Sequence, residues 1–117
     1  MSSTAKPWKL RIRHMLEAIA SCQSYVQGLN QEELAIKPQT LHAIAWNLTI
    51  LGEAARHVPE EVAQRYPEIP WPQLRGMRNH IVHGYDQIDL EIVWNVVTVE
   101  LRPLVASIER MLQEPDY

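Results

Sequence analysis

The sequence has few features of a secreted or membrane-spanning protein. Cys22 is the only cysteine, so no disulfide can form within the chain. The opening residues, MSSTAKP, lack the apolar segment of a signal peptide. No uninterrupted apolar run approaches the roughly 18 residues that a membrane-spanning helix requires. We therefore expect a cytoplasmic protein with no segment inside a membrane.

Positive charge is also scarce. Eleven Lys and Arg residues stand against 14 Asp and Glu residues, which gives a net charge of −3. Such a chain lacks the global positive field that drives non-specific binding to nucleic acids. Any site for RNA or a nucleotide must therefore be local. One stretch without acidic residues concentrates positive and titratable groups: Arg75, Arg78, His80 and His83.

The composition is that of an ordinary globular protein. Hydrophobic residues make up 46% of the chain and charged residues 21%, close to the average for soluble domains. A length of 117 residues fits one domain that can bury a core without a metal or disulfide. We expect a single domain over residues 1–117, with flexible tails at about 1–7 and 113–117.

Apolar residues recur at helical spacing, so the predicted fold class is all-α, an up-and-down bundle of four to five helices. The predicted helices cover about residues 8–26, 39–57, 72–83 and 89–112, with a short helical turn at 60–66. Gly28 and Gly84 follow two of them, where glycine commonly ends a helix. Asp89 is a good N-cap for the last helix, and Pro103 predicts a bend between residues 99 and 103.

The segment EIVWNVVTVEL, residues 91–101, is rich in β-branched residues, but the cap at Asp89 and the continuing apolar pattern favour a helix. Placed on a helix, its apolar residues cover nearly the whole circumference. One face would pack inside the domain, and the others need a second cover. We therefore predict a homodimer, against the alternative that this helix is simply central in the bundle.

The candidate site is the segment RNHIVHGY, residues 78–85. Polar residues share a broad face of the predicted third helix: Arg75, Arg78, Asn79 and His83. Asn79 and His83 would be stacked neighbours one turn apart. Arg78 and His83 are about 140° apart on an ideal helix. A shared site therefore needs the long Arg side chain or an irregular last turn.

Each candidate also has a structural explanation. Arg and His are favoured in the last turn of a helix because they offset its negative dipole end. His80 and His83 supply only two metal ligands without a nearby Cys or acid, so we predict neither a metal nor a cofactor. On the second helix, Asn47 and Glu53 either line the site or belong to a solvated face. Cys22 falls on an apolar stripe, which favours a core residue over a nucleophile.

The order Arg78, four residues, His83, one residue, Tyr85 is the R-x4-H-x-Y pattern, and the sequence resembles a HepT-type member of the HEPN superfamily. The resemblance extends over NLTILGEAAR, PEIPWPQLRGMRNHIVHGYDQIDLEIVW and the LRPL break in the last helix. It covers roughly residues 8–112.

This resemblance implies a helical bundle that dimerises so that two motifs face each other across a cleft. It implies that Arg78 and His83 belong to a metal-independent endoribonuclease site acting on RNA. It also implies a toxin whose antitoxin is an MNT-type nucleotidyltransferase that adds AMP to Tyr85.

Two classes of function follow. The first is a ribonuclease toxin, in which Arg78 supplies a permanent charge and His83 acts as acid or base near neutral pH. The second is a non-catalytic HEPN module that binds nucleotides or RNA, or serves as a partner of the nucleotidyltransferase. The intact motif favours the first class, and the acidic net charge favours the second.

Overall fold

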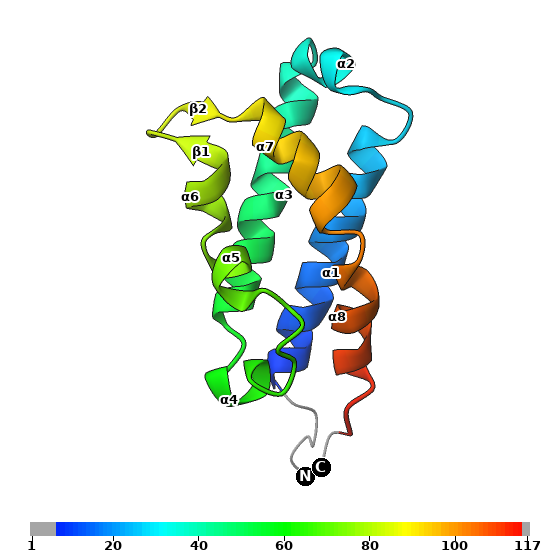
Figure 1. Cartoon of the computed structure of the whole chain (residues 1–117), viewed down its shortest axis with the longest axis vertical. Coiled ribbons are helices and arrows are strands. Elements are labelled where there is room, and N and C mark those ends of the chain that lie inside the picture. The colour runs from blue at the N-terminus through cyan, green and yellow to red at the C-terminus, as the bar shows by residue number, and fades with distance from the viewer. Residues whose placement is uncertain (1–6, 116–117) are drawn as a thin grey trace.

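The computed structural model describes residues 7–115, which form an all-α fold, and the predicted fold class is confirmed (Figure 1). The elements are α1 (Pro7–Val26), α2 (Gln31–Ala35), α3 (Pro38–Arg56), α4 (Glu60–Ala63), α5 (Trp71–Arg75), α6 (Met77–Ile81), β1 (Val82–His83), β2 (Gln87–Ile88), α7 (Leu90–Asn95), the π-helix η1 (Val96–Glu100) and α8 (Leu104–Leu112). The described residues form more helices than predicted, because several short helices lie between the long ones along the chain.

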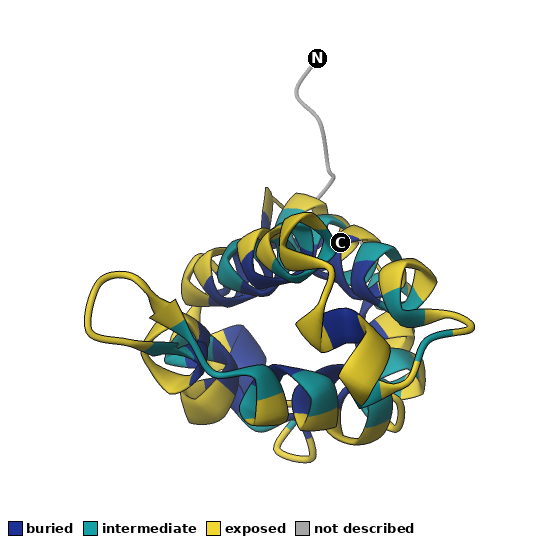
Figure 2. Cartoon of the chain, turned by 90° about the horizontal axis from the view of Figure 1, so that it is seen from above, coloured by how far each residue is buried: buried dark blue, intermediate teal, exposed yellow. Residues whose placement is uncertain are grey.

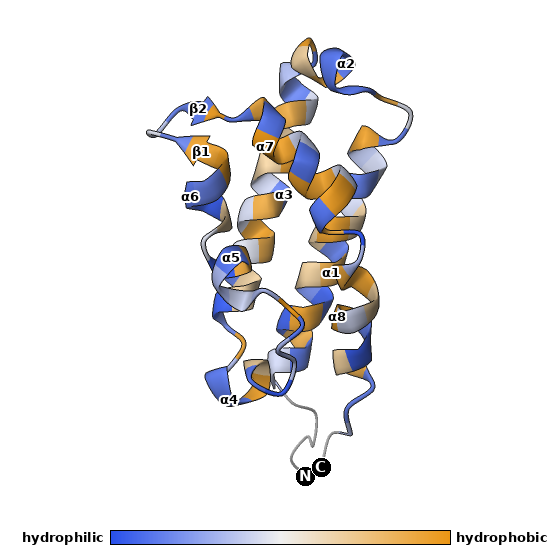
Figure 3. Cartoon of the chain, in the orientation of Figure 1, coloured by the Kyte–Doolittle hydropathy of each residue, from blue (hydrophilic) through white to orange (hydrophobic). Residues whose placement is uncertain are grey.

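Two long helices form the scaffold. α1 and α3 lie side by side along the long axis of the molecule, and α8 packs against the N-terminal half of α1 (Figure 1). Buried residues lie on the faces that the helices turn toward one another (Figure 2). Hydrophobic residues recur on α1, α3 and α8 at the spacing of such faces (Figure 3). The largest fully buried side chains include Ile12, Met15, Ile19, Ile44, Leu48, Leu51, Ile108 and Met111.

Three sequence signals for helix ends are confirmed. Gly28 follows α1 with a φ of 80°. The Asp89 side chain caps α7, since its Oδ1 accepts a hydrogen bond from the backbone N–H of Ile92 at 3.0 Å. The predicted bend in the last helix is a full break, because residues 101–103 form a turn between η1 and α8. Pro103 lies in that turn and cannot donate a backbone hydrogen bond there.

The prediction of one helix over residues 72–83 is wrong. Gly76 separates α5 from α6, and α6 ends at Ile81. The next residues form an antiparallel hairpin instead, in which Val82 pairs with Ile88. Gly84, with a φ of 71°, lies in the hairpin loop. The error has a physical reason, since a glycine with positive φ can end a helix or turn a hairpin.

The short helix α2 was not predicted, although the sequence carries its signal. Asn30 Oδ1 accepts a hydrogen bond from the backbone N–H of Glu33 at 2.8 Å, and the backbone N–H of Asn30 donates to Glu33 Oε1 at 2.9 Å. This reciprocal pair is a capping box.

The apolar segment of residues 90–101 is only partly covered within one chain. Four of its residues are buried: Val93, Val96, Val97 and Leu101. Three are half-buried: Leu90, Ile92 and Trp94. Val99 is 59% exposed. Apolar surface therefore remains available, and the homodimer stays a prediction.

The C-terminal end is anchored to the loop after α4. The Tyr66 hydroxyl donates to Oε2 of Glu114 at 2.6 Å, and Arg65 pairs with the same carboxylate. Burial, with the hydrogen bond to Glu114, raises the pKa of Tyr66 to about 12. The tails predicted to be flexible lie outside the described residues apart from Pro7 and residues 113–115. Between residues 7 and 115, no helix is long and apolar enough to cross a membrane.

Candidate functional site

A close helix contact holds the motif segment against α3. A Cβ added to Gly52 of α3 would lie 2.7 Å from the carbonyl oxygen of Leu74 and 3.2 Å from the Cβ of Met77. Only glycine therefore lets α5 and α6 approach α3 this closely. Arg78 follows Met77 in α6, so this contact also fixes the position of the Arg78 backbone.

Arg78 shares a small hollow with Glu53, a candidate from another helix. Both line a hollow of about 120 Å³, here called the Arg78 hollow, together with Thr49, Arg56 and Asn79. Arg78 is exposed, and its Nη1 donates to Oδ1 of Asn79 at 3.3 Å. Glu53 forms an exposed ion pair with Arg56 at 3.8 Å. The fold thus brings three candidates together at one place: Glu53, Arg78 and Asn79.

Arg75 also lines the Arg78 hollow, but its guanidinium is committed to the fold. It donates to the carbonyl oxygens of Ala55 at 3.2 Å and Val58 at 3.1 Å, and to Oε1 of Glu60 at 2.9 Å. The guanidinium also lies 5.6 Å from the centre of the Trp71 ring. The Arg75 side chain therefore links α5 to the residues around α4, and its role in the site stays a prediction.

His83 lies on β1, so the predicted stacking of Asn79 and His83 on one helix is wrong. Its Nε2 lies 3.5 Å from Oδ2 of Asp89. Both residues line a hollow of about 490 Å³, here called the His83 hollow, which also includes Glu91. Arg78 does not line it. Within one chain, Arg78 and His83 therefore face different hollows.

His80 lines a third hollow, an apolar groove of about 700 Å³ between α5–α6 and η1–α8. Its lining includes Leu74, Met77, Val96 and Leu101. Asn79 lines both this groove and the Arg78 hollow. Among residues 7–115, no three or more His, Cys, Asp or Glu residues are grouped so that they could hold a metal ion.

The other candidates have distinct environments. Tyr85 is 88% exposed in the hairpin loop. Asn47 is half-buried, and its Nδ2 donates to the carbonyl oxygen of Ala43 at 2.9 Å, one turn back in α3. Cys22 is fully buried, as predicted, and burial raises the pKa of its thiol to about 12. It therefore stays protonated at neutral pH and is not a nucleophile.

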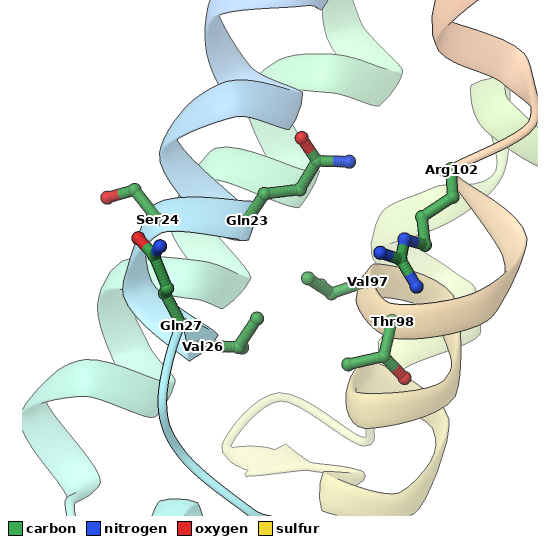
Figure 4. A pocket seen from close by; sticks show the side chains of 7 residues that line it. All are labelled: Gln23, Ser24, Val26, Gln27, Val97, Thr98 and Arg102. Carbon is green, nitrogen blue, oxygen red and sulfur yellow. The ribbon is translucent and has the colours of Figure 1, made fainter.

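A further hollow of about 540 Å³ lies between the end of α1 and η1 (Figure 4). Arg102 extends toward it, Gln23 borders it from α1, and Gln27 borders it from the turn after α1. Its lining contains none of the site candidates, and we assign no function to it.

Sequence reasoning missed the residue that faces His83. Asp89 was predicted only as a helix cap, yet it also contacts His83. The sequence signal was Gly84 followed by a polar loop and Ile88, which fits a hairpin that returns the chain to the motif.

Comparisons with known proteins agree with this architecture. The sequence profile of the family described as "Ribonuclease HepT-like" matches residues 15–111. A Caldanaerobacter subterraneus protein named "Putative RNase" is 26% identical over 111 residues, covering 95% of this chain and 96% of that protein. The "Probable ribonuclease HepT" of Thermococcus cleftensis is 26% identical over 100 residues, covering 86% and 91%. No solved structure matches with significance.

The fold and the exposed motif define a small all-α domain of the HEPN type. The profile match spans most of the chain, and the chain therefore belongs to the HepT-like ribonuclease family.

Proposed function

We propose that this chain is a metal-independent ribonuclease and the toxin of a HEPN/MNT toxin–antitoxin pair. One observation carries the proposal. Arg78 and His83 have the R-x4-H spacing on which the resemblance to HepT-type proteins rests, and both are exposed on short segments next to the long helices. Both side chains can therefore reach an RNA backbone without any unfolding.

The chemistry needs an acid, a base and a cation. As base, His83 takes the proton of a 2′-hydroxyl, whose oxygen then attacks the adjacent phosphorus. The bond from phosphorus to the 5′-oxygen breaks, and that oxygen takes a proton from the acid. The products are a 2′,3′-cyclic phosphate and a 5′-hydroxyl. Arg78 stabilises the extra negative charge on the phosphorane through its bidentate guanidinium.

A homodimer would complete this set of groups. One motif supplies one such histidine, and a second copy supplies another. The separate hollows of Arg78 and His83 within one chain support a site assembled from two copies. The apolar groove beside Asn79 and His80 supports a partner surface next to the motif. His80, exposed on α6, is the alternative second histidine within one chain.

The test is cleavage of labelled cellular RNA by purified protein in excess EDTA, after intact mass shows that Tyr85 is unmodified. We expect the wild type to cleave, and His83→Ala and Arg78→Ala each to lose at least about 100-fold in rate. Arg102→Ala is the matched control, since Arg102 is an exposed arginine outside the motif, and it should cleave at the wild-type rate.

Stability must be measured in parallel. His83 and Arg78 are exposed, so both variants should unfold within about 0.5 kcal/mol of the wild type. Wild-type activity in His83→Ala would remove His83 from the mechanism. Loss of wild-type activity in EDTA would contradict the metal-independent reaction.

We propose that the antitoxin neutralises the enzyme at Tyr85. Its exposure of 88% gives a nucleotidyltransferase free access. The tyrosine oxygen would attack the α-phosphorus of ATP and release pyrophosphate, and the phenolic proton would leave to solvent or a base. The attached AMP would place a phosphate near Arg78 and block the binding of RNA. Tyr85→Phe should cleave RNA but resist the antitoxin and ATP. If the antitoxin fully neutralised Tyr85→Phe without binding to it directly, this step would be refuted.

The second candidate is a non-catalytic HEPN module that binds RNA or nucleotides, or mainly serves the nucleotidyltransferase. The net charge of −3 favours it, because an acidic protein is a poor general RNA binder. A folded, unmodified dimer that cleaves no RNA would move the assignment to this candidate.

A further inference from the structure

We infer that Asp89 is a positioning residue for His83, holding the imidazole in place and balancing the charge that it gains. The inference deepens the proposed function and rests on it. It assigns a second role to a residue that already caps α7.

Two hydrogen bonds fix the position of Asp89. Its backbone N–H donates to the carbonyl oxygen of Ile81 at 2.8 Å, which ties it to the end of α6. Its Oδ1 accepts from the backbone N–H of Ile92 at 3.0 Å. The hairpin brings His83 beside it, because His83 pairs with Gln87. The second carboxylate oxygen, Oδ2, is then left at 3.5 Å from Nε2 of His83.

The two oxygens thus serve two purposes. Oδ1 sets the orientation of the carboxylate through the helix cap, and Oδ2 faces the imidazole. A carboxylate in this place favours the tautomer with the proton on Nε2 and stabilises the imidazolium that forms when the ring accepts another proton. Nδ1 is then the nitrogen that exchanges a proton with RNA. Asp89 itself neither gives nor takes a proton.

Partial burial strengthens the contact. The Asp89 side chain is 25% exposed, whereas His83 is 58% exposed. The carboxylate therefore sits against the protein while the imidazole remains open to a substrate. A distance of 3.5 Å also leaves room for the contact to shorten when RNA binds.

The test needs substitutions of Asp89 that keep the helix cap but remove the negative charge. Asp89→Asn does so, because Asn is as good an N-cap as Asp but is neutral. Asp89→Ser also keeps a cap and is too short to reach His83. Glu109→Gln is the matched control, since Glu109 is an exposed acid on α8 that does not line the His83 hollow.

Two measurements test the role of Asp89, and a third checks that the variants fold. In RNA cleavage, we expect Asp89→Asn and Asp89→Ser to lose about 10- to 100-fold in kcat, less than the ~10⁴-fold effect in a fully buried Asp–His pair. Glu109→Gln should keep the wild-type rate. In ¹⁵N NMR of the imidazoles, assigned with His83→Ala, the preference of neutral His83 for the Nε2–H tautomer should weaken in both Asp89 variants. The denaturant unfolding midpoint should match that of the wild type, because both substitutions keep a helix cap.

The outcomes separate the two proposals. Wild-type cleavage and wild-type tautomer ratio in Asp89→Asn would overturn the role of Asp89 and leave the ribonuclease intact. If the wild-type protein cleaves no RNA, the proposed function fails, and an unchanged NMR signal in Asp89→Asn would then overturn the contact as well.

Discussion

The scaffold of α1 and α3 and the motif segment of residues 76–89 are built in opposite ways. The scaffold helices are 20 and 19 residues long, and each buries a regular apolar stripe. The motif segment consists of a five-residue helix and two strands of two residues each. Its polar side chains are exposed apart from the partly buried Asp89, and it contacts the core mainly through Met77 and Ile81.

This contrast shows how a small protein can present chemistry on a few residues. Long helices gain stability from buried apolar area, so the motif segment does not need to stabilise the fold. It needs only to be placed, and that placement depends on a few local devices. They are the close approach at Gly52, the positive φ at Gly84 and the cap at Asp89.

The largest effect in this comparison is expected from Gly52→Ala, which would break the link between the two regions. The new methyl group would meet a backbone oxygen at 2.7 Å, so α5 and α6 must shift outward. We expect a loss of about 1–2 kcal/mol, since overpacking costs about 1–3 kcal/mol and alanine regains part of this through helix propensity. RNA cleavage should fall too, because Arg78 moves with α6. Denaturant unfolding and the cleavage assay measure both effects.

Gly76→Ala is the matched control, because its Cβ would come no closer than 3.4 Å to the oxygen of Pro72. This is an ordinary contact, and the φ of Gly76 is −94°, which suits any residue. We expect little change in stability or cleavage. Equal behaviour of the two variants would show that the Gly52 contact does not position the motif.

The scaffold was predictable from the sequence because its signals are repeated. Apolar periodicity over about five turns overrides any single residue, so α1 and α3 were predicted with nearly correct ends. The cap at Asp89 and a bend near Pro103 were also predicted, since each depends on one residue with one dominant conformational effect, although the structure shows a full break in place of the bend.

The motif segment was less predictable because its signals are short and ambiguous. The residues from Pro72 to His83 fit one amphipathic helix in sequence, and only the fold shows the break at Gly76. Glu53 and Arg78 are 25 positions apart, so their shared hollow depends on helix packing. The contact of Asp89 with His83 depends on the hairpin register. Long-range geometry of this kind leaves no periodic trace in one sequence.

The smallest effect is expected from Gly84→Ala, which perturbs the motif segment and leaves the scaffold untouched. A Cβ at Gly84 would meet nothing within 4 Å, but the φ of 71° is strained for alanine, at a cost of about 1–2 kcal/mol. The hairpin can open locally, so the free energy of global unfolding should change by less than this amount. Hydrogen exchange of the Asp89 amide, which bonds to Ile81, should instead speed up several-fold. Gly84→Asn is the control, because Asn tolerates positive φ, and it should protect that amide nearly as well as glycine. Equal exchange in wild type and Gly84→Ala would mean that the loop conformation does not hold His83 beside Asp89.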